Sequence, residues 1–396
     1  MKPEEYRELI ASRDIDLMVS KFKPLSEKQR SSLEKEAVKL LKEARKEDQR
    51  LQETRQYDDM VNEGWALVGI MAVASWSEAR KQLLYDLAEK YYGPDDRERI
   101  KLDQRLHATI QILIDRKPEW IPEYVEKNIK CEYWSGDLTL LLKLVEAGLA
   151  PHPVSEEYLR KLSNEAQPHY IDFDRFPRVL EEDIWKFFSM ESPPFWALSK
   201  LKNIDLNKWR ENLFPDEQEE NQEWMYSRNA SWPRLFINFS HQGRIDRQKL
   251  ISGTLFAFQN QKEATLRKSL LLFLELLEIN TEELIIHQGE IVNLLSSSHT
   301  NVVTYAISQL ESLRNSDQLD ISGLNEVLPE VFAIDSKAGP LKAITFLGKV
   351  TNKKPELQQQ FQPSIEAALK NPQKDVQLAV VKLLDKWLKQ NKSLRS

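Results

Sequence analysis

The sequence predicts an all-α protein built from stacked helix pairs. Glycine is scarce, with 11 residues in 396, while the helix formers Lys, Glu, Leu and Gln are abundant. In addition, a small residue followed by a large one recurs in the second half of the chain, which indicates that similar helices stack in series. We therefore expect an α-α superhelix whose helical N-terminal half is the less regular part.

The stacking is inferred from an alanine that is followed four residues later by a leucine. This pair recurs at spacings of 37 and 36 residues. Positions four apart share a helix face, so the small residue admits a neighbouring helix and the large one fills the gap. The pairs are Ala306 and Leu310, Ala343 and Leu347, and Ala379 and Leu383, with Ser269 and Phe273 as a less regular fourth copy. Two helices in each period of about 36 residues are typical of a HEAT-like solenoid.

Helical periodicity and helix-end signals give the elements in order. Ser26 with Gln29 has the spacing of a capping box, and so does Asn280 with Glu283. Asp246 is placed to cap the helix that follows it. In the first half we expect helices over 25–52, 63–76, 77–92, 99–115, 118–130, 136–151, 155–162 and 179–190. In the second half we expect them over 246–259, 264–278, 281–296, 301–313, 323–334, 338–350, 354–369 and 371–390.

Charge composition suggests a boundary between the halves. Residues 211–223, "ENLFPDEQEENQE", hold six acidic residues and no basic one, which is typical of an exposed loop. We therefore expect an irregular helical-repeat region over 1–210, an acidic linker over 211–231 and HEAT-like helix pairs over 232–396.

Several stretches of the sequence resemble one uncharacterised bacterial family. They are "IDRKPEW", "LVEAGLAPHPVSEEYLRKL", "EEDIWKFF" and, above all, "HQGRIDRQKLISGTLFAF". The family is a domain of unknown function, number six-four-nine-three, and the resemblance covers most of residues 60–350. It implies HEAT-like repeats, and it brings no established reaction.

No motif predicts catalysis, a metal site or a cofactor. The closest glycines, Gly64 and Gly69, are five residues apart, which is too far for a phosphate-binding loop. No two of the six histidines have zinc-ligand spacing, and the single cysteine, Cys131, permits no internal disulfide. The charged start of the chain and the lack of an apolar run of about 20 residues predict a cytoplasmic protein with no membrane partner.

Two groups of arginines are candidate partner-binding residues. Arg244 and Arg247 flank a tight turn and could hold a carboxylate or phosphate, unless they serve only to fix that turn. Arg116 and Trp120 could form a binding patch or simply stack on each other.

The C-terminal end carries a third candidate surface. Residues 336–396 have a net charge of +8 in a chain of net charge −6, so residues 1–335 carry −14. At about 100° per residue, four lysines of the last helix share one stripe. They are Lys374, Lys382, Lys386 and Lys389, at about 0°, 80°, 120° and 60°. This stripe is either a solubilising cap or a seat for an acidic partner or phosphates, and Asp375 and Asp385 lie within it.

The leading functional prediction is a non-enzymatic scaffold that binds another protein. Solenoids present long binding surfaces, and no residue cluster here indicates a reactive centre. The alternative is nucleic-acid binding through the basic end, including glycosylase-type chemistry. The overall acidity of the chain makes this alternative the less favoured one.

Overall fold

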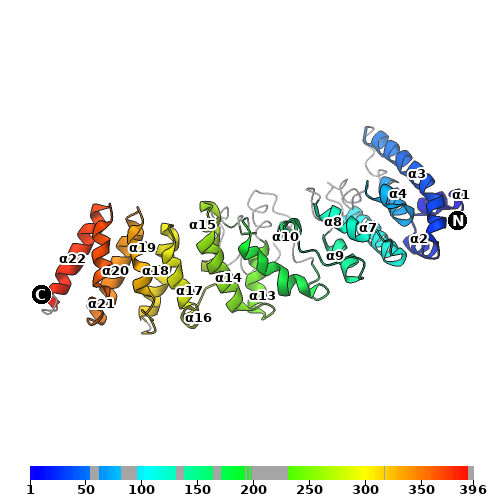
Figure 1. Ribbon diagram of the computed structural model, residues 1–396. Coiled ribbons are helices and arrows are strands. Elements are labelled where there is room, and N and C mark those ends of the chain that lie inside the picture. The colour runs from blue at the N-terminus through cyan, green and yellow to red at the C-terminus, as the bar shows by residue number, and fades with distance from the viewer. Residues whose placement is uncertain are drawn as a thin grey trace. The chain divides into compact units, whose positions relative to one another are not determined.

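The structure, a computed structural model, describes residues 1–53, 62–81, 96–130, 138–163, 171–191, 194–195, 198, 231–315 and 317–390. Over these residues the chain forms helices and turns and no strand, so the all-α prediction is confirmed (Figure 1). Within the same residues, no helix combines the length and the apolar character that crossing a membrane requires.

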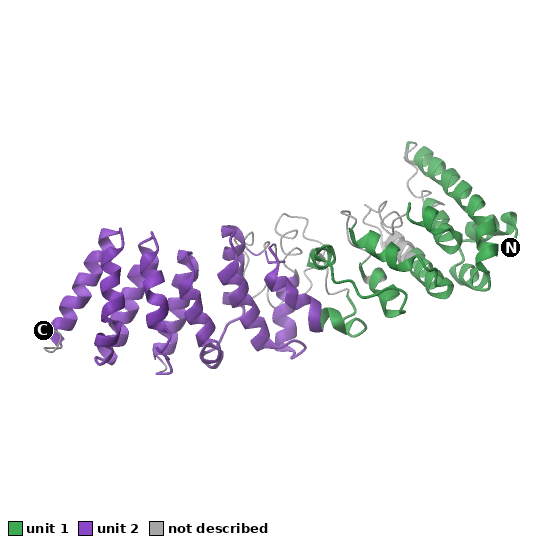
Figure 2. Cartoon of the chain, viewed as in Figure 1, with its two compact units in different colours: residues 1–180 green, residues 181–396 purple. Residues whose placement is uncertain are grey.

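The chain divides into two compact units, residues 1–180 and residues 181–396 (Figure 2). This division falls upstream of the predicted acidic linker. Residues 211–230 of that linker lie outside the described residues, and residue 231 begins a helix.

Unit 1 is organised around α4 (Asn62–Val73), in which every residue from Glu63 onward is buried. α4 contacts α1 (Pro3–Ser12), α3 (Glu27–Glu53) and α7 (Asp96–Arg116). Because its sequence is apolar on every side, it is stable only in the interior of the unit. The unit also contains α2 (Ile15–Phe22), α5 (Trp76–Ala79), α8 (Ile121–Lys130), α9 (Leu138–Glu146) and α10 (Glu156–Ser163).

In unit 2 the helices form two rows. α18, α20 and α22 contact one another in series, and so do α17, α19 and α21. Contacts of α17 with α18, α19 with α20, and α21 with α22 join the rows into stacked pairs. These helices are α17 (Gln288–Asn293), α18 (Thr300–Asn315), α19 (Leu324–Ala333), α20 (Ala338–Lys353), α21 (Leu357–Ala367) and α22 (Lys374–Gln390). Before them come α13 (Ser231–His241), α14 (Arg247–Asn260), α15 (Ala264–Leu276) and α16 (Thr281–Ile286).

The small and large residues of the repeat lie at the helix interfaces. Ala306 and Ala343 are buried, as are the leucines four residues after them, whereas Ala379 is half-buried. Side-chain contacts join residues about one period apart: Arg247 and Glu283 are separated by 36 residues, and Lys349 and Glu311 by 38. One helix pair is thus bonded to the next through equivalent positions.

The segment 179–190, predicted as an α-helix, has a different backbone. It forms a π-turn at Val179–Asp183 and then a 3₁₀-helix at Ile184–Ser189. A 3₁₀-helix has three residues per turn, so Ile184 and Phe187 both reach the core. Tertiary packing of these side chains overrides the α-helical pattern of the sequence.

Candidate functional site

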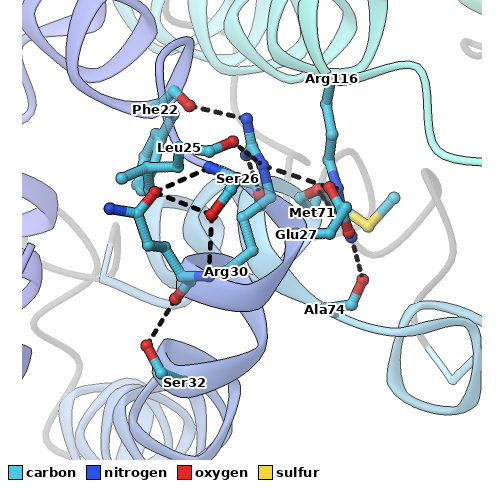
Figure 3. A network of polar contacts seen from close by, with 11 residues as sticks. Phe22, Leu25, Ser26, Glu27, Arg30, Ser32, Met71, Ala74 and Arg116 are labelled. Atoms are coloured by element: carbon cyan, nitrogen blue, oxygen red, sulfur yellow. Dashed lines mark hydrogen bonds and ion pairs between the residues drawn. The ribbon is translucent and has the colours of Figure 1, made fainter.

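Arg116, one of the predicted partner-binding residues, is committed to the interior of unit 1. Its guanidinium donates to the carbonyl oxygens of Met71 and Ala74 at 3.1 and 2.8 Å (Figure 3). It also makes two hydrogen bonds to the carboxylate of Glu27, at 3.0 and 2.8 Å. The side chain of Arg116 is only 2% exposed. The hydrogen bond from Arg116 lowers the pKa of Glu27 below its ordinary value, which favours the ionised carboxylate.

A second arginine completes this network. Arg30 donates to the carbonyl oxygens of Leu25, Ala72 and Phe22 at 3.1, 2.5 and 2.7 Å (Figure 3). Arg30 and Arg116 therefore satisfy carbonyl groups at the C-terminal ends of α2 and α4, where the helix dipole favours positive charge. Burial, assisted by repulsion from Arg116, lowers the pKa of Arg30.

Trp120 also belongs to the core rather than to a surface. Its ring stacks on Trp76 at 6.0 Å between centroids and meets the ring of Tyr124 edge-on at 5.6 Å. The guanidinium carbon of Arg116 lies 5.5 Å from the Trp120 ring centroid. These contacts favour the alternative in which Arg116 and Trp120 stack on each other within unit 1.

The turn before α14 shows the same outcome for Arg247. Asp246 caps α14 as predicted, because its carboxylate accepts from the backbone N–H groups of Gln248 and Lys249. Arg247 binds Glu283 through two hydrogen bonds, at 2.5 and 3.1 Å, and donates to the Leu277 carbonyl oxygen at 2.6 Å. Arg247 thus holds a carboxylate of the same chain, which favours the alternative in which it fixes local structure.

Glu283 has two structural tasks. Besides holding Arg247, it completes the predicted capping box of α16 with Asn280, with both reciprocal bonds at 3.0 Å. Burial raises the pKa of Glu283, but hydrogen bonds from Arg247 and from the Asn280 backbone outweigh this, and the net pKa lies below the ordinary value.

Arg244 stays on the surface. Gly243 precedes it with φ of 70°, which gives the sharp turn that a glycine permits. The Arg244 guanidinium stacks 4.4 Å from the centroid of the Phe239 ring. The two arginines of this turn therefore contact different groups, Phe239 and Glu283, rather than one shared ligand.

The four predicted lysines are all exposed on α22. Lys389 pairs with Asp385 at 2.6 Å, and Asp375 is held at 3.2 Å by Lys337, the residue before α20. Within the described part of the chain, Lys374, Lys382 and Lys386 have no acidic partner. The positive charge of the stripe is therefore carried mainly by three lysines.

Next to these lysines lies an apolar surface that the sequence reasoning missed. Leu378 and Val381 are 58% and 54% exposed, and Leu388 is 38% exposed. With Lys374 at 0°, they lie at about 40°, 340° and 320° on the helix wheel, so they overlap the start of the lysine stripe, and Asp385 lies among them at about 20°. We call the three apolar side chains, with Lys374, Lys382 and Lys386, the α22 surface.

The sequence held a signal for this surface. The buried face of α22 is already filled by Val376, Val380, Leu383 and Trp387. The other aliphatic residues of the helix are therefore not needed for packing inside the stack. Thirty-six residues earlier, the positions equivalent to Lys382 and Lys386 are Phe346 and Val350, which are buried. The side of α22 that carries Lys382 and Lys386 is therefore polar, as a solvent-facing surface requires. The exposed aliphatic side chains near it are not polar.

Comparison with known proteins places most of the chain in one family. The family described as Domain of unknown function (DUF6493) matches residues 2–338. No curated protein and no solved structure matches the chain. The match stops at the first residue of α20, so the α22 surface lies beyond the part that the family covers.

Proposed function

We propose that this chain, which belongs to the family Domain of unknown function (DUF6493), is a non-enzymatic scaffold that binds another protein through its α22 surface. The observation that carries the proposal is the exposure of Leu378 and Val381 beside three lysines that lack acidic partners among the described residues. Fully burying a Leu or Val side chain contributes about 1.5–3 kcal/mol, so a partner gains from covering them. A cytoplasmic location, inferred from the sequence, is part of the same proposal.

Helix stacking supports the scaffold role. The contacts between successive helix pairs of unit 2 support a HEAT-like stack, and such stacks present extended binding surfaces. A helix pair that serves only as a solubilising cap needs a polar outer face. The exposed Leu378 and Val381 argue against that simple role for α22.

The same surface supports nucleic-acid binding less well. Lysines suit phosphates, and Lys374, Lys382 and Lys386 could each neutralise one. However, Asp375 and Asp385 lie among them, and the aliphatic edge has no counterpart on a phosphate backbone. A protein partner uses both the charge and the apolar area.

The test is a capture experiment with matched variants. The intact chain and a Leu378→Glu/Val381→Glu variant serve as bait in a lysate of cells that naturally express the protein. A Val154→Glu/Ile286→Glu variant is the control, because it adds the same charge at equally exposed apolar positions elsewhere. We expect a protein that the wild type and the control retain and the α22 variant loses. Equal retention by all three baits would contradict the proposal.

A further inference from the structure

We propose that the α22 surface receives an amphipathic helix with acidic flanks, because exposed aliphatic side chains and lysines with no acidic partner among the described residues share the exposed side of α22. This inference rests on the proposed function and adds the chemistry of the partner. The steps below concern the length, the charge and the packing of that surface.

The length of the apolar edge fits a helical ligand. Leu378 to Leu388 spans ten residues, which is about 15 Å along the axis, or nearly three turns. A helix laid beside α22 presents apolar residues at i, i+3 or i+4 and i+7 over the same length.

The lysines of the α22 surface favour a partner that carries acidic residues. Asp375 and Asp385 are already engaged, by Lys337 at 3.2 Å and by Lys389 at 2.6 Å. Lys382 and Lys386 extend away from the apolar edge, at about 80° and 120° on the wheel. Glu or Asp residues on one flank of the docked helix would face them, which favours the correct orientation and suppresses basic partners.

The packing inside the stack gives a further requirement. A side-chain carbon added to Gly348 of α20 would lie 3.3 Å from Leu383 of α22, so the glycine gives Leu383 its close approach. Thirty-six residues later the equivalent position is Leu384, which is half-buried. At this position α22 therefore has a large residue where α20 has a small one. For a similarly close approach, the partner helix must have an Ala or Gly opposite Leu384.

A membrane surface fits these features less well. Amphipathic helices that lie on membranes expose a wide apolar face, often with aromatic residues. In α22 the wide apolar face, including Trp387, is buried in the stack, and the exposed edge is aliphatic. Asp375 and Asp385 on the exposed side also oppose anionic lipids.

The experiment uses designed fluorescent peptides and the intact chain. The probe is a helical peptide of about 20 residues with a Leu and Ala stripe and Glu flanks. Its controls are a scrambled peptide and a peptide with Lys in place of every Glu. We expect saturable anisotropy changes with the acidic peptide alone. We also expect about tenfold weaker binding for Leu378→Glu/Val381→Glu and for Lys382→Glu/Lys386→Glu, and unchanged binding for Val154→Glu/Ile286→Glu.

Three results would overturn the inference. They are no saturable binding of the acidic peptide up to about 1 mM, equal binding of the acidic and basic peptides, or binding instead to vesicles of phosphatidylcholine and phosphatidylserine. The capture experiment separates the two proposals. If capture depends on Leu378 and Val381 but the acidic peptide does not bind, the proposed protein binding is supported and the proposed helical ligand is rejected. If capture is indifferent to these residues, the proposed function itself falls.

Discussion

Trp387 donates a hydrogen bond from its indole Nε1 to Oγ1 of Thr351 across 3.1 Å, and both side chains are buried. The Thr351 hydroxyl in turn donates to the carbonyl oxygen of Leu347 at 2.8 Å, so its oxygen and its proton are both used. The two residues lie 36 positions apart on successive helices of one row. The bond therefore fixes the last described helix pair to the pair before it.

Replacing Thr351 with Val should weaken this junction. The shape is nearly kept, but the buried indole N–H loses its acceptor, which costs about 1–3 kcal/mol of unfolding free energy. Chemical denaturation measures the loss. Thr345→Val is the matched control, because Thr345 lies on the exposed side of the same helix and its hydroxyl bonds only to that helix. Equal losses for the two variants would mean that the Trp387 bond contributes nothing.

A larger residue at Ala343 should overpack the interface between helix pairs. Ala343 is buried one turn before Leu347, so Phe there forces neighbouring helices apart and destabilises by about 1–3 kcal/mol. Ala338→Phe is the control at the exposed first position of α20. Thermal unfolding should show a lower midpoint for Ala343→Phe alone. An unchanged midpoint would show that the register of the repeat is wrong.

Ionisation of Glu283 should make unit 2 sensitive to acid. Its folded-state pKa lies below the ordinary value, so the stabilisation is present above the unfolded-state pKa and is lost as pH falls through the folded-state pKa. Glu283→Gln should be less stable than wild type at pH 7 and lose less stability between about pH 5 and pH 3. Glu282→Gln, at the exposed neighbouring position, is the control for denaturation at each pH. Parallel pH profiles for wild type and Glu283→Gln would contradict this account.

Arg116 should be a stabilising residue that lysine cannot replace. A lysine side chain lacks the planar fork that reaches Glu27 and two carbonyl oxygens together. We expect Arg116→Lys and Arg116→Met each to lower the unfolding free energy by about 1–3 kcal/mol, because buried acceptors lose partners. Lys117→Met, at an exposed position, should have little effect. Full stability of Arg116→Lys would show that charge alone suffices.

The sequence predicted the features of the structure that depend on residues close together in the chain. The caps at Asp246 and Asn280 depend on residues within three positions, and the buried alanines depend on a pattern within one helix and its copies. These features form as predicted because nothing distant competes with them. The all-α class follows from the same short-range signals.

Distant contacts decided the roles that the sequence could not assign. Arg116 and Glu27 are 89 residues apart, and the carbonyl groups that Arg116 binds are more than 40 residues away from it. Leu378 and Val381 are 58% and 54% exposed, and the sequence of α22 alone does not reveal this, because exposure depends on which helices pack around it. Only the surplus of aliphatic residues in α22 hinted at that surface.

Nucleic-acid binding should be absent at physiological salt. Four lysines that each neutralised a phosphate of duplex DNA would give a log–log salt slope of about −3 to −4. We expect no saturable binding of random duplex or single-stranded DNA near 150 mM salt, measured by fluorescence titration at two salt concentrations (about 50 and 150 mM). Micromolar or tighter binding that disappears when Lys374, Lys382, Lys386 and Lys389 become Glu would favour the nucleic-acid alternative instead.

Site-specific photo-crosslinking tests the central claim most directly. A photoreactive amino acid is placed at Val381 of the intact chain, and at Val154 as the equally accessible control, in cells that naturally express the protein. We predict a discrete protein adduct from position 381 that is absent from position 154 and that disappears when Leu378 is changed to Glu. No adduct at 381, or the same adducts from both positions, would contradict the claim that the α22 surface binds a protein partner.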